Sequence, residues 1–207
     1  LPYPRNLYAA FLASQDERIG GLLAMLDEQG LRERTIVVFQ SDNGHSTEDR
    51  AHGGGGSAGP FRGAKSSFFE GGIRVPAIIS WPGSLPEGAV RDQVAHAADW
   101  LPTLAELCRV EPPPVKLDGA SLVPLLRHGQ AAGPHATASL HWQLGAGLQA
   151  NWAVREGDWK LIHRADEPPF LVNLQDDPGE KKNVAAAHED VVKRLTGLHD
   201  RHLRASP

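Results

Sequence analysis

A very apolar run, Thr35-Ile36-Val37-Val38-Phe39, leads through a single glutamine into the polar tetrapeptide Ser41-Asp42-Asn43-Gly44. Runs of this kind are typical of strands that are buried on both faces of a parallel sheet. Ligands of open α/β sheets bind beyond the carboxyl ends of such strands. The sequence therefore predicts a buried strand at 35–40, with Asp42 and Asn43 at a ligand-binding edge.

Two readings of Asp42 and Asn43 compete. Asp-Asn-Gly is a common turn, and Asn-Gly is a strong hairpin signal. However, residues 44–63 form a glycine-rich stretch that is too long for a hairpin, and long loops inside compact domains are often functional. Asp and Asn offer only oxygen ligands, which suit calcium or magnesium better than zinc. We therefore expect Asp42 and Asn43 to bind a hard cation, with calcium as the first choice and magnesium as the second.

Lys65 follows the glycine-rich loop and has small neighbours in Arg62-Gly63-Ala64-Lys65-Ser66. A lysine is ordinarily a solvated surface residue. At this position, small neighbours would let a substrate approach, and an ammonium group is a point charge suited to a tetrahedral oxyanion. Together with Asp42 and Asn43, Lys65 indicates metal-assisted chemistry on a sulfate or phosphate ester.

Three histidines are weaker candidates for a functional role. His45 and His52 flank the glycine-rich loop, where histidine can act as a general acid or a ligand. His141 lies in the motif His-Trp-Gln of a predicted strand and could face a substrate. The chain has ten histidines, so a structural or solvated role is the alternative for each of the three.

Composition limits the classes of function. With 207 residues, 41% hydrophobic and 22% charged, the chain is typical of a globular protein of one or two domains. The net charge of -4 argues against nucleic acid as a partner, and no apolar stretch approaches the length of a membrane span. The sequence carries no signal peptide and no initiator methionine, which favours a longer parent protein. One cysteine excludes an internal disulfide.

The pattern of apolar residues divides the chain into a larger α/β part, 1–130, and a smaller part, 131–207. In the larger part we expect a helix over 5–29 ended by Gly30, a strand over 75–81 and a helix capped by Asp99. In the smaller part we expect an antiparallel sheet and a terminal amphipathic helix. The predicted strands of this sheet are 137–143, 149–155, 158–164 and 170–174.

Several conspicuous residues are expected to be structural. Glu70 and Arg74 carry opposite charges and are expected to form a buried or half-buried pair that orients the loop before the second strand. Cys108 lies on an apolar helix and is expected to be a small core residue, since free cysteines usually are. The tryptophans are expected to be mostly core. They include Trp100, Trp142, Trp152 and Trp159.

The ordered motifs of this chain resemble the C-terminal portion of sulfatases, within the alkaline-phosphatase superfamily. The resemblance spans essentially all 207 residues. It rests on Ser41–Gly44, Phe61–Lys65, Phe69–Pro76, Trp81–Gly83, Asp99–Thr103, Leu117–Leu122, Gly157–Ile162 and Asn173–Asn183. It implies a partial large mixed sheet with helices, followed by a small antiparallel sheet and helix. It also implies a sulfuric ester hydrolase that acts on sulfated sugars or aryl sulfates, as bacterial sulfatases do.

The same resemblance implies residue roles. Asp42 and Asn43 match the second pair of calcium ligands of the family, and Lys65 matches a lysine that contacts the sulfate oxygens. The nucleophile of the family is a formylglycine formed within a Cys-or-Ser-x-Pro-x-Arg segment, and no such string occurs here. Cys108 cannot take its place, because Arg109-Val110-Glu111 follows it. The implied chain is therefore inactive without an N-terminal half, and the whole protein is expected in the periplasm or outside the cell.

Two alternatives remain open at this stage. A phosphodiesterase or phosphonate monoester hydrolase of the same superfamily would share the aspartate and lysine, although Asn43 stands where those relatives commonly carry histidine. A non-catalytic binding or structural protein could also keep this scaffold. The upstream reading frame would separate these possibilities.

Overall fold

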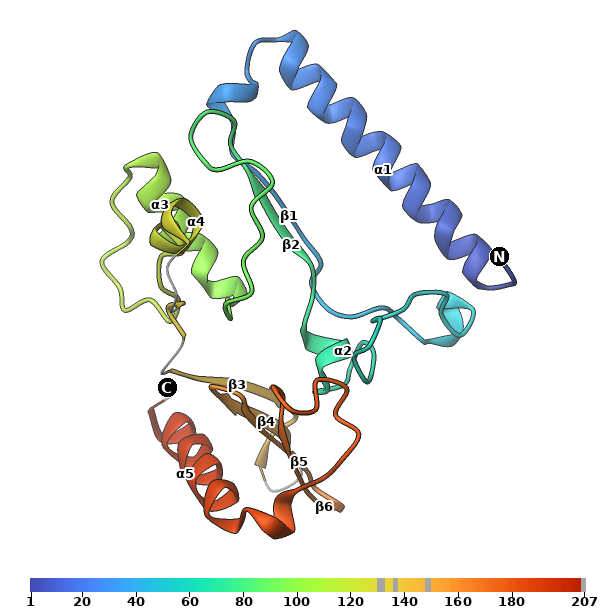
Figure 1. Cartoon of the computed structure of the whole chain (residues 1–207), viewed down its shortest axis with the longest axis vertical. Helices are drawn as coiled ribbons and strands as arrows, with labels where there is room; N and C mark the ends of the chain where they lie inside the picture. Colours follow the sequence, from blue (N-terminus) through green and yellow to red (C-terminus); the bar gives the residue numbers. More distant parts are fainter. Residues whose placement is uncertain (130–132, 136–137, 148–149, 206–207) are drawn as a thin grey trace.

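The computed structural model describes residues 1–129, 133–135, 138–147 and 150–205. These residues form two separate sheets with helices around them (Figure 1). The first sheet pairs β1 (Val37–Gln40) with β2 (Ala77–Ser80). The second sheet has the order β3-β4-β5-β6, so the architecture is mixed α/β with a separate antiparallel sheet, as predicted. The expected boundary between the two parts, at 130/131, lies outside the described residues.

The second sheet is built from consecutive antiparallel neighbours, whose bounds are Ser139–Leu144 (β3), Asn151–Glu156 (β4), Trp159–Arg164 (β5) and Glu167–Asn173 (β6). The hairpin predicted at Glu156-Gly157 is confirmed, because Glu156 pairs with Trp159 across the turn. The four predicted strands are likewise confirmed, although residues 137 and 149 of the predicted spans lie outside the described part of the chain.

Helix α5 (Glu189–Ala205) covers one face of this sheet (Figure 1). Its Val191 and Leu195 pack into a core with Val154, Leu161 and Leu171 of the strands. Leu195, Val154 and Leu171 are completely buried. The predicted terminal helix is therefore confirmed, and its apolar stripe is satisfied by the sheet.

The strand predicted at 35–40 is present as β1, but the prediction that it is buried on both faces of a parallel sheet was wrong. β1 pairs antiparallel with β2, in register Val38↔Ile79, and no parallel neighbour is found among the described residues. Val38 and Phe39 are 36% and 40% exposed. One face contributes to a core in which Ile36 and Ile79 pack on Leu85 and other residues, while the other face is open. An apolar run that would suit burial on both faces is thus half covered here.

Helix α1 (Arg5–Glu28) is 24 residues long and has no buried residue. It ends where Gly30 adopts a positive φ of 63°, as predicted. In Figure 1 the helix projects away from both sheets. Its exposed apolar side chains include Phe11, at 75%, and Leu22, at 53%. These side chains leave apolar surface exposed along α1. None of the helices in the described ranges has the length and apolar character that a membrane crossing needs.

Helix α3 (Trp100–Cys108), which is followed along the chain by the short helix α4 (Val123–His128), corrects two predictions. Asp99 precedes α3, but its side chain does not cap that helix. The buried carboxylate instead accepts the backbone N–H groups of His96 (2.7 Å) and Ala120 (2.9 Å), and it contacts Nε2 of His135 (2.8 Å). Cys108 is exposed, so the expectation of a core cysteine was wrong. Its position at the last turn of α3 turns it away from the buried Leu107.

Candidate functional site

The site begins where two stretches of backbone meet without side chains between them. Gly44, after β1, donates its N–H to the carbonyl oxygen of Gly72 at 2.9 Å. Gly72 belongs to the short helix α2 (Glu70–Ile73). A Cβ built at Gly44 would lie 2.9 Å from Gly72 Cα and closer still to the carbonyl oxygen of Gly71. Only glycine fits this close approach, so the tetrapeptide is held against α2.

Backbone hydrogen bonds then connect Lys65 to the same place. The N–H of Lys65 donates to the carbonyl of His45 at 3.0 Å, and the N–H of Gly71 donates to the carbonyl of Arg62 at 2.6 Å. Three segments are therefore tied together, namely residues 42–45, 62–65 and 70–72, and we refer to them as the tied segments. The backbone of Lys65 is therefore held next to His45, which follows the tetrapeptide that contains Asp42 and Asn43.

The side chain of Lys65 is partly exposed. Its Nζ atom lies 3.5 Å from Oε2 of Glu48, and the exposed fractions of the two side chains are 32% and 45%. A partly solvated ammonium group on the surface of the tied segments can reach an anion in solution. The structure therefore gives Lys65 an accessible charge, which is what its expected contact with a sulfate requires.

Asp42 and Asn43 stand just before His45, the residue whose carbonyl accepts the N–H of Lys65. Asp42 is exposed, and its Oδ1 accepts the N–H of Asn43 at 2.9 Å. Its second carboxylate oxygen and the side-chain amide of Asn43 have no hydrogen bond to any other described residue. This donor set fits a hard cation, but it supplies two of the six to eight ligands that calcium takes. In the described ranges, no group of three or more His, Cys, Asp or Glu residues is arranged to hold a metal.

The three candidate histidines occupy different places. The Cβ of His45 lies against Gly56 of the glycine-rich loop, and the ring of His52 meets the ring of Tyr3 edge-on at 5.6 Å. His141 stacks on His202 of α5, with ring centroids 4.1 Å apart. Burial, and next the neighbouring His202, lower the pKa of His141 from 6.5 to about 4. Of these three, the structure brings only His45 and His52 to the loop beside Lys65.

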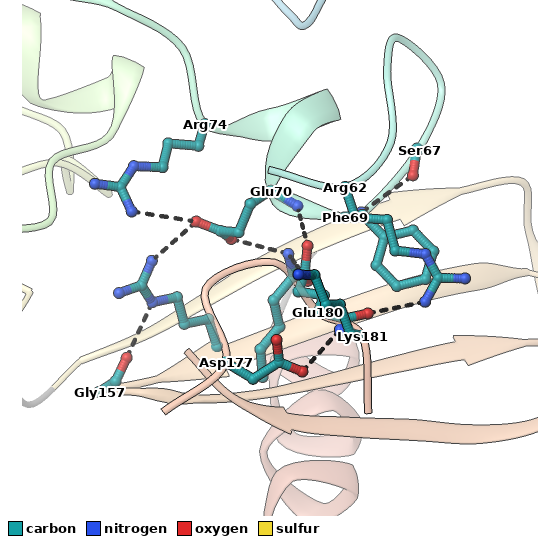
Figure 2. Close-up of polar contacts among 11 residues, drawn as sticks. Arg62, Ser67, Phe69, Glu70, Arg74, Gly157, Asp177, Glu180 and Lys181 are labelled. Atoms are coloured by element: carbon teal, nitrogen blue, oxygen red, sulfur yellow. Dashed lines mark hydrogen bonds and ion pairs between the residues drawn. The ribbon is translucent and has the colours of Figure 1, made fainter. Parts of the chain in front are cut away.

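The predicted pair of Glu70 and Arg74 exists, but it is not the main contact of Glu70. Arg74 Nη1 lies 3.9 Å from Glu70 Oε2, whereas Lys160 Nζ donates to Glu70 Oε1 at 2.9 Å. Two completely buried partners were missed in the sequence, namely Lys160 and Glu180, the second of which is labelled in Figure 2. The available signal was a lysine inside the strand Trp159-Lys160-Leu161-Ile162, where a charged residue is unexpected.

Solved structures of known proteins define the class of this fold. The chain superimposes on Ps i-CgsB in complex with k-i-k-neocarrahexaose with a TM-score of 0.85 and 25% identity, covering 97% of this chain and 43% of that one. A structure in complex with its substrate D-glucosamine-2-N,6-O-disulfate gives a TM-score of 0.75 and 25% identity, over 95% and 40%. The phosphonate monoester hydrolase of Agrobacterium radiobacter gives 0.67 and 27%, over 93% and 39%. The fold is the alkaline-phosphatase-like fold of sulfatases and their relatives.

Sequence comparison identifies the family within that class. The Sulfatase family model matches residues 3–110, and the model of the N-sulphoglucosamine sulphohydrolase C-terminal region matches residues 62–203. The chain belongs to the sulfatase family. It is 33% identical to arylsulfatase A of Bos taurus, over 90% of this chain and 40% of the relative. It is 38% identical to N-acetylgalactosamine-6-sulfatase of Canis lupus familiaris, over 96% and 43%. The chain thus spans about two fifths of the length of these relatives.

Proposed function

We propose that this chain supplies part of the calcium site and part of the sulfate-binding site of a sulfatase. The observation that carries the proposal is the backbone hydrogen bond from Lys65 to His45, which ties the lysine beside Asp42 and Asn43. Membership of the sulfatase family supports the reaction class, the hydrolysis of a sulfuric ester. If Lys65 were only a surface residue, it would not need the backbone hydrogen bonds that hold it against residues 42–45.

Each residue would have a separate electrostatic task. Asp42 and Asn43 would hold a calcium ion together with ligands from elsewhere in the protein, and the ion would withdraw charge from the sulfuryl oxygens. Lys65 would place its ammonium group against the same oxygens, so that the charge developing in the transition state is stabilised by a fixed group. His45 is the better placed of the two loop histidines to transfer a proton, because it belongs to the tied segments. His52 would contact the substrate from the glycine-rich loop.

The remaining machinery would come from another part of the protein. This sequence contains no segment in which a formylglycine could form, so we expect the nucleophile outside these 207 residues. The chain alone is therefore expected to be inactive. We expect the whole protein to work in the periplasm or outside the cell.

A sulfated sugar is the substrate class that we favour, with an aryl sulfate as the simple test substrate. The support comes from relatives whose names specify a sulfated sugar, namely N-acetylgalactosamine-6-sulfatase and the structure with D-glucosamine-2-N,6-O-disulfate. His141 was a candidate for contact with such a sugar. Its stacking on His202 of α5 makes it the weakest of the proposed substrate contacts.

A phosphonate monoester hydrolase is the second candidate function. The observation in its favour is the TM-score of 0.67 with the enzyme of Agrobacterium radiobacter. Against it stands Asn43, whose position is commonly a histidine in those relatives. A non-catalytic protein on the same scaffold is the third candidate, and it would need neither an accessible lysine nor free oxygen ligands.

One set of assays separates the three candidates. The whole protein is purified with calcium and offered an aryl sulfate, a phenyl phosphonate ester and a phosphodiester at equal concentration. A value of kcat/KM that is highest for the aryl sulfate and depends on Asp42 supports the sulfatase. A preference for the phosphonate ester would transfer the proposal to the second candidate, and no hydrolysis of any ester would favour the non-catalytic protein.

A further inference from the structure

Three charged side chains lie buried together between the tied segments and the second sheet. Glu70 is 2% exposed, and Lys160 and Glu180 are completely buried. Figure 2 shows Glu180 beside Glu70. Lys160 Nζ lies 2.9 Å from Oε1 of Glu70 and 2.9 Å from Oε1 of Glu180. One ammonium group therefore bridges two carboxylates.

Each of the three comes from a different element. Glu70 begins α2, Lys160 lies on β5, and Glu180 follows the turn after β6. Glu180 also accepts the backbone N–H of Glu70 on its Oε2 at 2.6 Å, so it bonds the first residue of α2 twice, directly and through Lys160. These contacts join residues that are 90 and 110 positions apart in the chain. The cluster thus connects α2 to the second sheet.

The cluster is next to the tied segments. Gly71 and Gly72, which hold Arg62 and Gly44 by backbone hydrogen bonds, directly follow Glu70. Arg62 Nη1 donates to the backbone carbonyl of Glu180 at 3.0 Å. The cluster therefore contacts the tied segments in two ways, through the glycines that follow Glu70 and through the hydrogen bond between Glu180 and Arg62.

The use of charges here has an energetic implication. Burying an ion pair is often no more stabilising than burying apolar residues of the same volume, so stability alone is a weak reason for this cluster. Lys160 donates a charge-assisted hydrogen bond to Glu70 and forms an ion pair with Glu180, and these contacts connect the three elements. Arg155 Nη1, at 3.6 Å from Glu70 Oε2, adds a second cation to the cluster. Burial raises the pKa of Glu180, which is consistent with a carboxylate that depends on Lys160 for its charge.

We propose that Lys160, held between Glu70 and Glu180, is a positioning residue for Lys65 and for the calcium ligands Asp42 and Asn43. It fixes α2 on the second sheet, and α2 fixes the tied segments through Gly71 and Gly72. The catalytic part of this inference rests on the proposed sulfatase function. The structural part, that Lys160 keeps the tied segments in one fixed conformation, is independent of that function.

The test compares Lys160→Met in the whole protein with a control of matched burial. The control is Leu195→Ala, which weakens the packing of α5 on the same sheet without a contact to the cluster. Both variants are assayed on an aryl sulfate at a temperature where each is fully folded by circular dichroism. For Lys160→Met we expect kcat to fall by on the order of a hundredfold with little change in KM, because a misplacement of about 1 Å in a catalytic group can have this effect. For Leu195→Ala we expect kcat per folded molecule to be unchanged.

A rescue variant keeps the test informative if Lys160→Met folds poorly. Lys160→Met leaves two carboxylates buried together, whereas Lys160→Met combined with Glu180→Gln leaves one, and the glutamine oxygen can still accept the N–H of Glu70. The double variant is therefore expected to fold better and to recover part of the lost activity. Additive losses in the double variant would show that Lys160 and Glu180 act separately, and this would overturn the proposal.

Hydrogen exchange provides the readout that needs no turnover. In Lys160→Met, the amides of Gly44, Lys65 and Gly71 are expected to exchange faster than in Leu195→Ala, because these amides make the hydrogen bonds of the tied segments. Equal exchange of these three amides in the two folded variants would overturn the proposal. If the wild-type protein hydrolyses no ester, the proposed function fails, and the exchange comparison still decides the role of Lys160.

Discussion

The Nζ atom of Lys65 lies 3.5 Å from Oε2 of Glu48, and both groups are partly exposed to solvent. Exposed ion pairs contribute about 0–1 kcal/mol, so this contact is easily exchanged for another anion. A sulfate group offers several oxygens to the same ammonium group. The pair therefore keeps Lys65 on the surface of the tied segments while leaving it available to a substrate.

Lys65→Ala tests the electrostatic role of the lysine. We expect kcat on an aryl sulfate to fall roughly a hundredfold, or about 3 kcal/mol, because the fixed charge acts mainly in the transition state. KM should change much less. Lys116→Ala, at an exposed position outside the tied segments, is the control with unchanged kcat. An unchanged kcat in Lys65→Ala would make this lysine an ordinary surface residue.

Asp42→Ala tests the calcium site. The whole protein should lose bound calcium and nearly all activity, as measured by metal analysis and by turnover in parallel. Asp166→Asn, at the exposed turn before β6, is the control and should keep both. Full calcium occupancy in Asp42→Ala would end the assignment. The 207-residue chain alone should bind calcium weakly, because two ligands leave the ion mostly hydrated.

Gly44→Ala tests the close approach of the tetrapeptide to α2. The added methyl group has no room beside Gly71 and Gly72, so we expect a loss of stability of about 1–3 kcal/mol and a lower kcat. Gly20→Ala in α1 is the matched control. Nothing lies within 4 Å of a Cβ at that position, and alanine is favoured over glycine in a helix by roughly 1 kcal/mol. Equal melting temperatures for the two variants would contradict the close approach.

The stability of the second sheet should depend on pH through His141. Its pKa is lowered from 6.5 to about 4 in the folded state, so the unfolded chain binds more protons between these values. The free energy of unfolding should therefore decrease as pH falls through this window. Burial also lowers the pKa of His199, which acts in the same direction. Burial raises the pKa of Glu180, so this group acts in the opposite direction and its contribution decreases as pH rises.

Because these groups act in opposite directions, the contribution of His141 is measured as the difference in the free energy of unfolding between wild type and a His141 variant. Denaturant unfolding of wild type and His141→Gln is followed from neutral pH down to about pH 4, the lower end of the expected window. The variant should lose part of the pH dependence, whereas His128→Gln, at an exposed position, should keep it. Identical pH profiles for wild type and His141→Gln would show that the buried ring does not titrate as expected.

The apolar surface of the N-terminal elements should be detectable in the 207-residue chain expressed alone. Phe11 on α1 and Ile78 on β2 are 75% and 59% exposed, and exposed apolar side chains of this kind bind hydrophobic dyes or promote aggregation. We expect strong dye binding and no hydrolysis of an aryl sulfate. A soluble monomer that unfolds cooperatively and hydrolyses the ester would contradict both the exposed surface and the external nucleophile.

The second sheet could be predicted because strands that pair in it are also neighbours along the chain. Short apolar runs separated by turn residues, with the Glu156-Gly157 turn between two of them, indicate consecutive antiparallel neighbours, and these appeared as expected. The strand at 35–40 could not be placed, because its apolar run is the same whether one face or both are covered. The exposure of Cys108 was likewise missed, since position on an apolar helix does not specify which side faces the core.

The roles given to the candidate site residues stay predictions. Motifs pointed to Asp42, Asn43 and Lys65, and Gly44 was visible within the tetrapeptide, whereas Gly71 and Gly72 lie outside the glycine-rich stretch 44–63. What the sequence could not show was the partner of each glycine, since Gly44 meets residues nearly thirty positions away. Lys160 and Glu180 were missed for the same reason. A buried lysine is recognised only when its carboxylates are known, and Glu70 lies 90 positions away.

The neighbour-to-neighbour order of β3-β4-β5-β6 has a consequence for how the molecule folds. Hairpins between consecutive strands close short loops, so this sheet can form early. The contacts of Glu70 with Lys160 and Glu180 close much longer loops, and they need a finished sheet to receive them. We therefore expect the surface that carries Asp42 and Lys65 to be the last region to become ordered, so that a chain with a native sheet would pass through a state in which its site is still absent.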